Sequence, residues 1–113
     1  MIGEFVASKT TNPEKLRRFQ EEAASCRPEI ALGDFQACNR FDVIKRLGSI
    51  TVPVLIVSAD EDQLTPPKYG EFLQNNIPQA CRIHVMAAGH IVPLEKPDEF
   101  NRAVIEFLDG ANL

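Results

Sequence analysis

A chain of 113 residues, 44% of them hydrophobic and 25% charged, has an ordinary globular composition and forms one domain at most, or part of one. Its formal net charge of −4, without any block of like charge, excludes a nucleic-acid-binding protein with a basic face. No apolar stretch approaches the roughly 18 residues of a membrane helix, and Met1 to Phe5 do not resemble a signal peptide. We therefore expect a cytoplasmic protein that does not span a membrane.

The first part of the chain has a helical pattern. Asn12-Pro13 is a typical helix start, because a proline at the first helical position loses no N–H that the helix needs. The apolar residues that follow recur at helical spacing, with charged residues outside that stripe. They are Leu16, Phe19, Ala23 and Cys26.

Two further helical segments are expected before residue 50. Pro28 ends the first helix or begins a second one over about 29–40. Asp42 can cap a short helix over 43–47, and Gly48 would end it.

The pattern changes to alternating strands and helices after Ile50. Residues 52–57 form a short apolar run rich in β-branched residues, which favours a parallel strand covered on both faces. A polar loop over 58–65 follows, then a helix that Pro66 and Pro67 open and that reaches about Asn75. A second strand is predicted over 81–86 and a loop over 87–96.

The last element is predicted to be a helix that Pro97 opens and Gly110 ends, with an apolar stripe on one side. The stripe consists of Phe100, Ala103, Val104, Phe107 and Leu108. Two strands joined through a helix pair in parallel with a right-handed crossover. The loops after both strands then lie at the carboxyl edge of an α/β sheet, where such folds bind ligands.

Those two loops carry the residues best suited to chemistry. The first holds Asp60, Glu61 and Asp62, and the second holds His90. Taken alone, the first loop is more typical of a solvated acidic turn, and a lone histidine after a glycine is commonly structural. Neighbouring parallel strands lie about 4.8 Å apart, so an acid from one strand end can meet a histidine from the next. A carboxylate on an imidazole N–H fixes the tautomer and supports the imidazolium.

Both loops resemble motifs of the α/β-hydrolase family. Asp62-Gln63-Leu64-Thr65-Pro66 is similar to the D-x-x-T-P acid loop, and residues 88–100 are similar to the histidine loop and final helix, G-H-x-x-x-x-E-x-P-x-x-F. Residues 41–53 resemble the return from a helical cap domain into the core sheet. The resemblance implies a partial α/β-hydrolase fold, with a helical cap-domain remnant at 1–50 and the C-terminal part of the core at 51–113.

By this resemblance Asp62 is the acid and His90 the base of a catalytic triad. Asp60 is the fallback for the acid, since it lies on the same loop. Ala59 stands where the family often has glycine, so the turn is expected to differ slightly.

Other reactive side chains are interpreted as structural. Glu95 is expected to anchor its loop or the start of the last helix. His84, inside the second predicted strand, is expected to be a structural or partly exposed residue. Cys81 lacks the glycine-flanked turn of a nucleophile and lies at the wrong end of its strand. Cys26, Cys38 and Cys81 show no CxxC spacing, which predicts three reduced, partly buried thiols rather than disulfides or a zinc site.

A nucleophile in the G-x-S-x-G pattern is missing. None of the four serines, Ser8, Ser25, Ser49 and Ser58, is flanked by glycines at that spacing. The family's chain order places nucleophile and oxyanion hole upstream of residue 1, so the isolated chain is expected to be inactive or nearly so. The first strand would also have an open edge, which predicts a homodimer or swapped assembly.

The functional hypothesis is a C-terminal fragment of a hydrolase that cleaves an ester, a lactone or a carbon–carbon bond, without cofactor or metal. These residues do not distinguish such a hydrolase from haloperoxidase-like and lyase members of the family. An alternative is a non-catalytic binding or interaction module on a decayed hydrolase scaffold, and a third possibility is a chain without function of its own.

Overall fold

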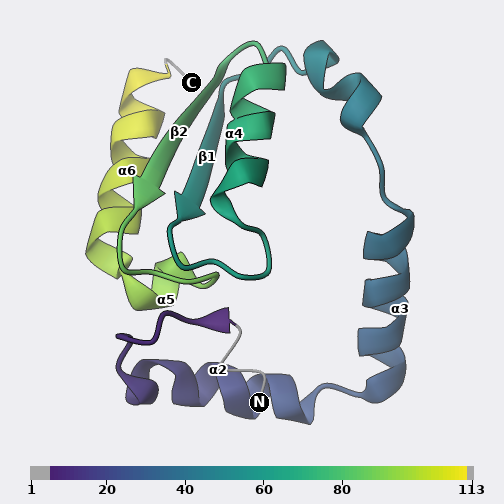
Figure 1. The fold of residues 1–113 in the computed structure, drawn as a ribbon, viewed down its shortest axis with the longest axis vertical. Helices are drawn as coiled ribbons and strands as arrows, with labels where there is room; N and C mark the ends of the chain where they lie inside the picture. Colours follow the sequence, from purple (N-terminus) through teal and green to yellow (C-terminus); the bar gives the residue numbers. More distant parts are fainter. Residues whose placement is uncertain (1–5, 112–113) are drawn as a thin grey trace.

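The computed structural model describes residues 6–111 and contains helices around a small sheet (Figure 1). Its longest helix has 14 residues, and no helix in this part of the chain combines the length and apolarity needed to cross a membrane. In chain order the elements are α2 (Pro13–Ser25), α3 (Pro28–Arg40), the 3₁₀ helix η1 (Ile44–Ser49), β1 (Val54–Ala59), α4 (Pro67–Asn76), β2 (Ala80–Val85), α5 (Val92–Glu95) and α6 (Pro97–Gly110).

The sheet consists of β1 and β2, which pair in parallel from Val54 opposite Ala80 to Ala59 opposite Val85. Because alternate strand residues point to opposite faces, the two faces carry different packing. Gly70 of α4 lies against Ile56 and Ser58 on one face, and a Cβ added to this glycine would be 3.2 Å from Ser58 Cβ. The other face packs against α6. The predicted α/β class with two parallel strands and a connecting helix is therefore confirmed.

The core lies beside the carboxyl ends of the strands. Ala59, Val85, Ala88 and Val92 are buried together at that end, and Phe100 of α6 packs against them. Burial of such side chains is the main stabilising contribution in a small domain. The loops that follow both strands therefore begin on the best-packed part of the molecule.

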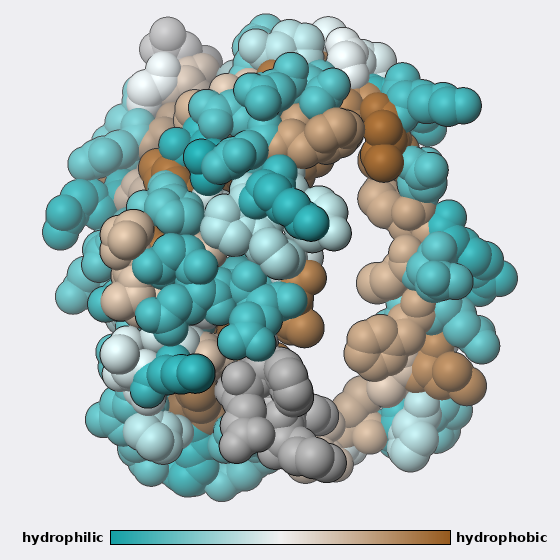
Figure 2. All heavy atoms as spheres, in the orientation of Figure 1, coloured by the Kyte–Doolittle hydropathy of each residue, from teal (hydrophilic) through white to brown (hydrophobic). Residues whose placement is uncertain are grey.

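The segment from α2 to η1 leaves the core and returns to it as an arc around an opening (Figures 1 and 2). The radius of gyration is 15.6 Å, larger than the about 13 Å typical of a compact chain of this length. Figure 2 shows apolar side chains along the side of α3 that faces the opening. Large apolar residues of this arc that are exposed include Ile30, Leu32, Phe35, Phe41 and Ile44.

Several sequence expectations need correction. The first strand begins at Val54 rather than Val52, because Pro53 has no N–H to donate and the pairing starts where Val54 N donates to Gln79 O. Gly48 does not end the short helix, which continues to Ser49. Gly48 does not adopt the left-handed conformation of a helix-ending glycine.

Two further expectations fail. The predicted loop over 87–96 contains the short helix α5. The predicted partial burial of the thiols is wrong, since Cys26, Cys38 and Cys81 are all exposed. Cys26 and Cys38 belong to the arc, which packs little against the core. Cys81 is an exposed residue of β2.

Candidate active site

The loops after β1 and β2 meet at one rim of the sheet. Asp60 N donates to Val85 O at 3.2 Å, and Glu61 N donates to Ala88 O at 3.0 Å. Ala88 N returns a hydrogen bond to Asp60 Oδ1 at 3.3 Å. These bonds extend the pairing of the strands into their loops, so the loops have a fixed separation.

Asp62 and His90 are in contact at this rim. Asp62 Oδ2 lies 3.0 Å from His90 Nδ1, and the side chains are 9% and 39% exposed respectively. A carboxylate can only accept, so this bond assigns the proton of the neutral imidazole to Nδ1. His90 Nε2 is then the nitrogen that can accept a proton from another group.

The Asp62 carboxylate is oriented by its own turn. Oδ1 accepts from Leu64 N and from Thr65 N, each at 2.9 Å, and Oδ2 accepts from Thr65 Oγ1 at 2.9 Å. Burial is the largest single effect on the Asp62 pKa and raises it. The hydrogen bonds from Thr65 and His90 together outweigh burial, so this pKa lies below its ordinary value. The carboxylate is therefore both ionised and fixed in direction.

The fallback acid, Asp60, is not brought to His90. Its carboxylate receives the backbone N–H of Ala88 instead. Burial again raises the Asp60 pKa, but hydrogen bonds from backbone groups, Ala87 and Ala88 foremost, outweigh it and lower that pKa. Ala59 is the last residue of β1 and has no positive φ, as expected for an alanine at this position. The positive φ, 52°, is at Ala87 in the other loop.

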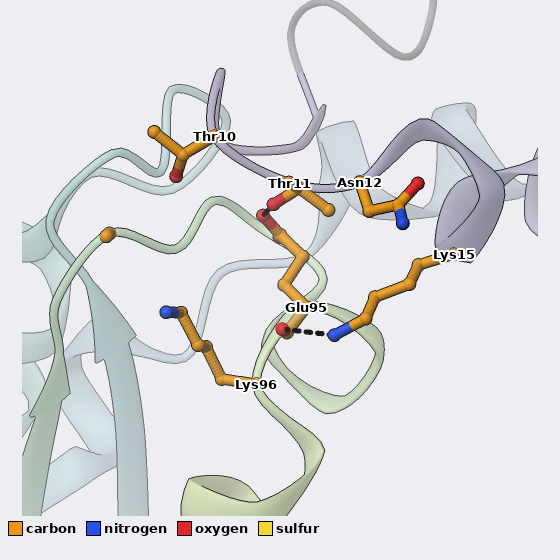
Figure 3. A pocket seen from close by; sticks show the side chains of 7 residues that line it. Thr10, Thr11, Asn12, Lys15, Glu95 and Lys96 are labelled. Atoms are coloured by element: carbon orange, nitrogen blue, oxygen red, sulfur yellow. Dashed lines mark hydrogen bonds between the residues drawn. The ribbon is translucent and has the colours of Figure 1, made fainter.

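Glu95 holds the histidine loop from inside. Its side chain is buried and accepts four hydrogen bonds, in keeping with the expected anchoring role. Oε1 accepts from Gly89 N at 3.0 Å and Oε2 from Ile91 N at 3.1 Å, on either side of His90. Figure 3 shows the small cavity of about 190 Å³ beside this carboxylate, where Lys15 Nζ donates to the Glu95 carbonyl at 3.4 Å.

Residues 6–9, called the rim segment below, complete the site and were not identified from the sequence. Val6 O accepts from His90 N at 2.7 Å, and Ser8 N donates to Glu95 Oε1 at 2.7 Å. A cavity of about 570 Å³ opens between this segment and the acid loop. Gly89 is the sequence feature that could have indicated the contact between the histidine loop and the rim segment. A Cβ at this position would lie 2.6 Å from Ala7 C, so only glycine fits beside the rim segment.

The remaining reactive side chains lie elsewhere. His84 is exposed on β2, with Nδ1 3.2 Å from Ser58 Oγ, and Cys81 is near the start of the same strand. The described residues contain no cluster of three or more histidine, cysteine or acidic side chains that could hold a metal ion.

The serine hydroxyls have partners other than His90. Ser8 donates to Glu61, Ser25 to the Glu22 carbonyl, Ser49 to the Arg46 carbonyl and Ser58 to the Ile83 carbonyl.

Known proteins are similar to this chain in sequence and in fold. Residues 6–97 match the family model described as alpha/beta hydrolase fold. The 2-hydroxy-6-oxo-6-phenylhexa-2,4-dienoate hydrolase of Comamonas testosteroni is 34% identical over 96% of this chain and 40% of that protein. The 3-oxoadipate enol-lactonase 1 of Acinetobacter baylyi is 36% identical over 62% of this chain and 27% of the lactonase. A thermophilic esterase of Thermogutta terrifontis superposes with a TM-score of 0.88 at 24% identity, covering 97% of this chain and 42% of the esterase. The chain thus spans less than half of each.

The close approach of Gly89 to the rim segment makes a stability prediction. Gly89→Ala places a methyl group against the backbone of Ala7, which must move, and we expect the free energy of unfolding to fall by about 2 kcal/mol. Gly33→Ala is the matched control, because Gly33 lies in α3 with nothing within 4 Å, and this variant should gain about 0.5–1 kcal/mol. Urea denaturation of both variants measures the difference, and equal effects would contradict the contact.

The lowered pKa of Asp62 predicts how the free energy of unfolding depends on pH under acidic conditions. A carboxyl whose pKa is lower in the folded state stabilises the fold fully above the unfolded pKa of about 3.9, and that contribution is lost as the pH falls through the folded pKa. Wild type should therefore exceed Asp62→Asn in unfolding free energy at pH 7, and the gap should shrink toward pH 2. Asp34→Asn, a change on the exposed surface of α3, serves as control. A gap that is independent of pH would contradict the pKa shift.

Proposed function

This chain belongs to the α/β-hydrolase fold family, and on that premise we propose that it supplies the acid, Asp62, and the base, His90, of a Ser-His-Asp triad. The observation that carries the proposal is the 3.0 Å contact between Asp62 Oδ2 and His90 Nδ1 at the carboxyl rim of parallel strands. That contact uses Nδ1 and leaves Nε2 for proton transfer, which is the division of roles that the triad requires.

The nucleophile is proposed to come from a segment of the hydrolase outside residues 1–113. Support comes from the serines described above, whose hydroxyls have partners other than His90. The relatives that this chain matches are more than twice its length, which leaves room for such a segment. The opening bounded by the arc is the proposed place for it, and residues 1–50 are proposed to be part of a cap over the substrate.

The proposed chemistry is acyl transfer to water. His90 Nε2 takes the proton of the serine hydroxyl as the serine oxygen bonds to the substrate carbonyl carbon, and the Asp62 carboxylate stabilises the imidazolium. His90 then returns the proton to the departing group, which is an alcohol for an ester or lactone and a carbon atom where a carbon–carbon bond is cleaved. A water molecule, deprotonated in the same way, releases the acid and regenerates the serine. Esters, lactones and carbon–carbon bonds next to a carbonyl are the proposed substrate class, and the enol-lactonase among the similar proteins supports the lactones.

A chimera tests the proposal. We expect the chain joined to the part of the Thermogutta terrifontis esterase outside the aligned region to hydrolyse p-nitrophenyl esters, and the chain alone to show only the background rate. In the chimera, His90→Ala or Asp62→Asn should lower kcat by about 10³-fold or more. His84→Ala and Asp60→Asn are the matched controls and should retain most of the activity, because neither residue contacts the triad pair.

Two results would contradict the proposal. One is turnover by the chain alone that disappears in His90→Ala, since this would locate the nucleophile within residues 1–113. The other is a folded, active chimera in which His90→Ala keeps full activity. Loss of activity in Asp60→Asn but not in Asp62→Asn would move the acid role to the fallback residue.

Self-association of the isolated chain is a second proposal. Within the described residues β1 pairs with β2 on one side only, and an open edge of an apolar strand readily pairs with another copy. We expect light scattering at about 100 μM to give the mass of a homodimer, in the micromolar affinity range of small interfaces. Val54 N donates to Gln79 O and so lies on the paired side of β1, which makes Val54→Pro unsuitable. Leu55→Lys places a charge on the strand and should favour the monomer. A monomeric wild type at that concentration would contradict the proposal.

A further inference from the structure

The rim segment contacts both loops of the candidate site. Val6 O accepts from His90 N, and Lys9 N donates to Glu61 Oε2 at 3.3 Å. The segment is distant from both loops in the sequence. It therefore adds a connection between them that is independent of the strand pairing.

Ser8 by itself contacts both loops. Its backbone N–H donates to Glu95 Oε1 at 2.7 Å, on the histidine side. Its hydroxyl donates to Glu61 Oε2 at 2.5 Å, on the acid side. Ser8 is only 5% exposed, and Thr10 N donates to its hydroxyl oxygen at 3.2 Å. A hydroxyl has one proton, and a carboxylate must accept it, so the Ser8 proton is committed to Glu61.

We propose that Ser8 is a positioning residue that couples the acid loop to the histidine loop and thereby holds Asp62 against His90. This inference rests on the proposed function of the pair. It assigns Ser8 a role without contact to the reacting atoms, and it differs from a nucleophilic role, which would need the Ser8 proton to be directed at His90.

Ser8 can act on the pair because both of its acceptors lie close to Asp62 and His90 in the chain. Glu61 immediately precedes Asp62, and Glu95 accepts from the residues on either side of His90. Charge-assisted hydrogen bonds from one residue to both carboxylates fix the two backbones relative to each other. A hydrogen bond between side chains weakens steeply with misalignment, so the Asp62–His90 contact depends on that relative position. Loss of the Ser8 hydroxyl leaves Glu61 without one of its partners. The acid loop then keeps its backbone bonds to the histidine loop but is held less tightly by the rim segment, which loosens the position of Asp62.

The test follows the ionisation of Asp62 in the chain itself, by the pH titration of its carboxyl carbon in NMR spectra. Ser8→Ala removes the hydroxyl but keeps the N–H to Glu95, and Ser8→Cys keeps the size but donates weakly. We expect both variants to shift the Asp62 titration midpoint upward, because its contact with His90 stabilises the carboxylate. Ser49→Ala is the matched control, an exposed serine on η1 whose hydroxyl donates to the Arg46 carbonyl, and it should leave the midpoint unchanged.

A double-mutant cycle identifies the route of the coupling. Glu61→Ala changes the local charge by itself, so the comparison is the effect of Ser8→Ala in the wild type and in the Glu61→Ala chain. The shift caused by Ser8→Ala should disappear when Glu61 is absent. If Ser8→Ala and Ser8→Cys lower only the unfolding free energy and leave the midpoint of Asp62 in place, Ser8 is a packing residue and the inference is wrong.

His90→Ala separates this inference from the proposed function. If His90→Ala raises the Asp62 midpoint and Ser8→Ala does not, the pair stands and the role of Ser8 is overturned. If His90→Ala leaves the midpoint unchanged, Asp62 and His90 do not interact, and both proposals fail.

Discussion

The parallel pairing of β1 with β2 is the constraint on which the site depends. Its register places Ala59 opposite Val85, so the two strands end level with each other and their loops leave from the same rim. An antiparallel pair would send these loops to opposite ends of the sheet. The buried cluster of Ala59, Val85, Ala88 and Val92 lies at this rim, so the best-packed residues and the candidate catalytic residues share one support.

Buried carboxylates are the second feature of the rim. Glu95 is 4% exposed and has four hydrogen-bond donors, three of them backbone N–H groups, which offsets the cost of removing its charge from water. The Asp62 carboxylate likewise accepts hydrogen bonds from backbone N–H groups of the turn that follows it. The result is a rim in which the acid and the base loops are each held by a carboxylate, while the imidazole itself stays partly open to solvent.

Periodicity predicted the α/β class and the longer helices, and the resemblance to α/β-hydrolase motifs predicted the meeting of Asp62 with His90. They could not predict that α3 is exposed, because an apolar stripe shows which face seeks a partner but not whether that partner lies within these residues. The contacts of residues 6–9 with both rim loops were not predicted either. Their contacts use backbone groups and one hydroxyl, which have no periodic signature, and only the glycine at position 89 marks them.

Direct observation of the proton between the two side chains tests the account most simply. In a chain labelled with ¹⁵N-histidine, the account predicts a downfield Nδ1–H signal from His90 that disappears in Asp62→Asn and persists in Asp60→Asn. A His90 that carries its neutral-state proton on Nε2, or a signal that survives the loss of the Asp62 carboxylate, would contradict it.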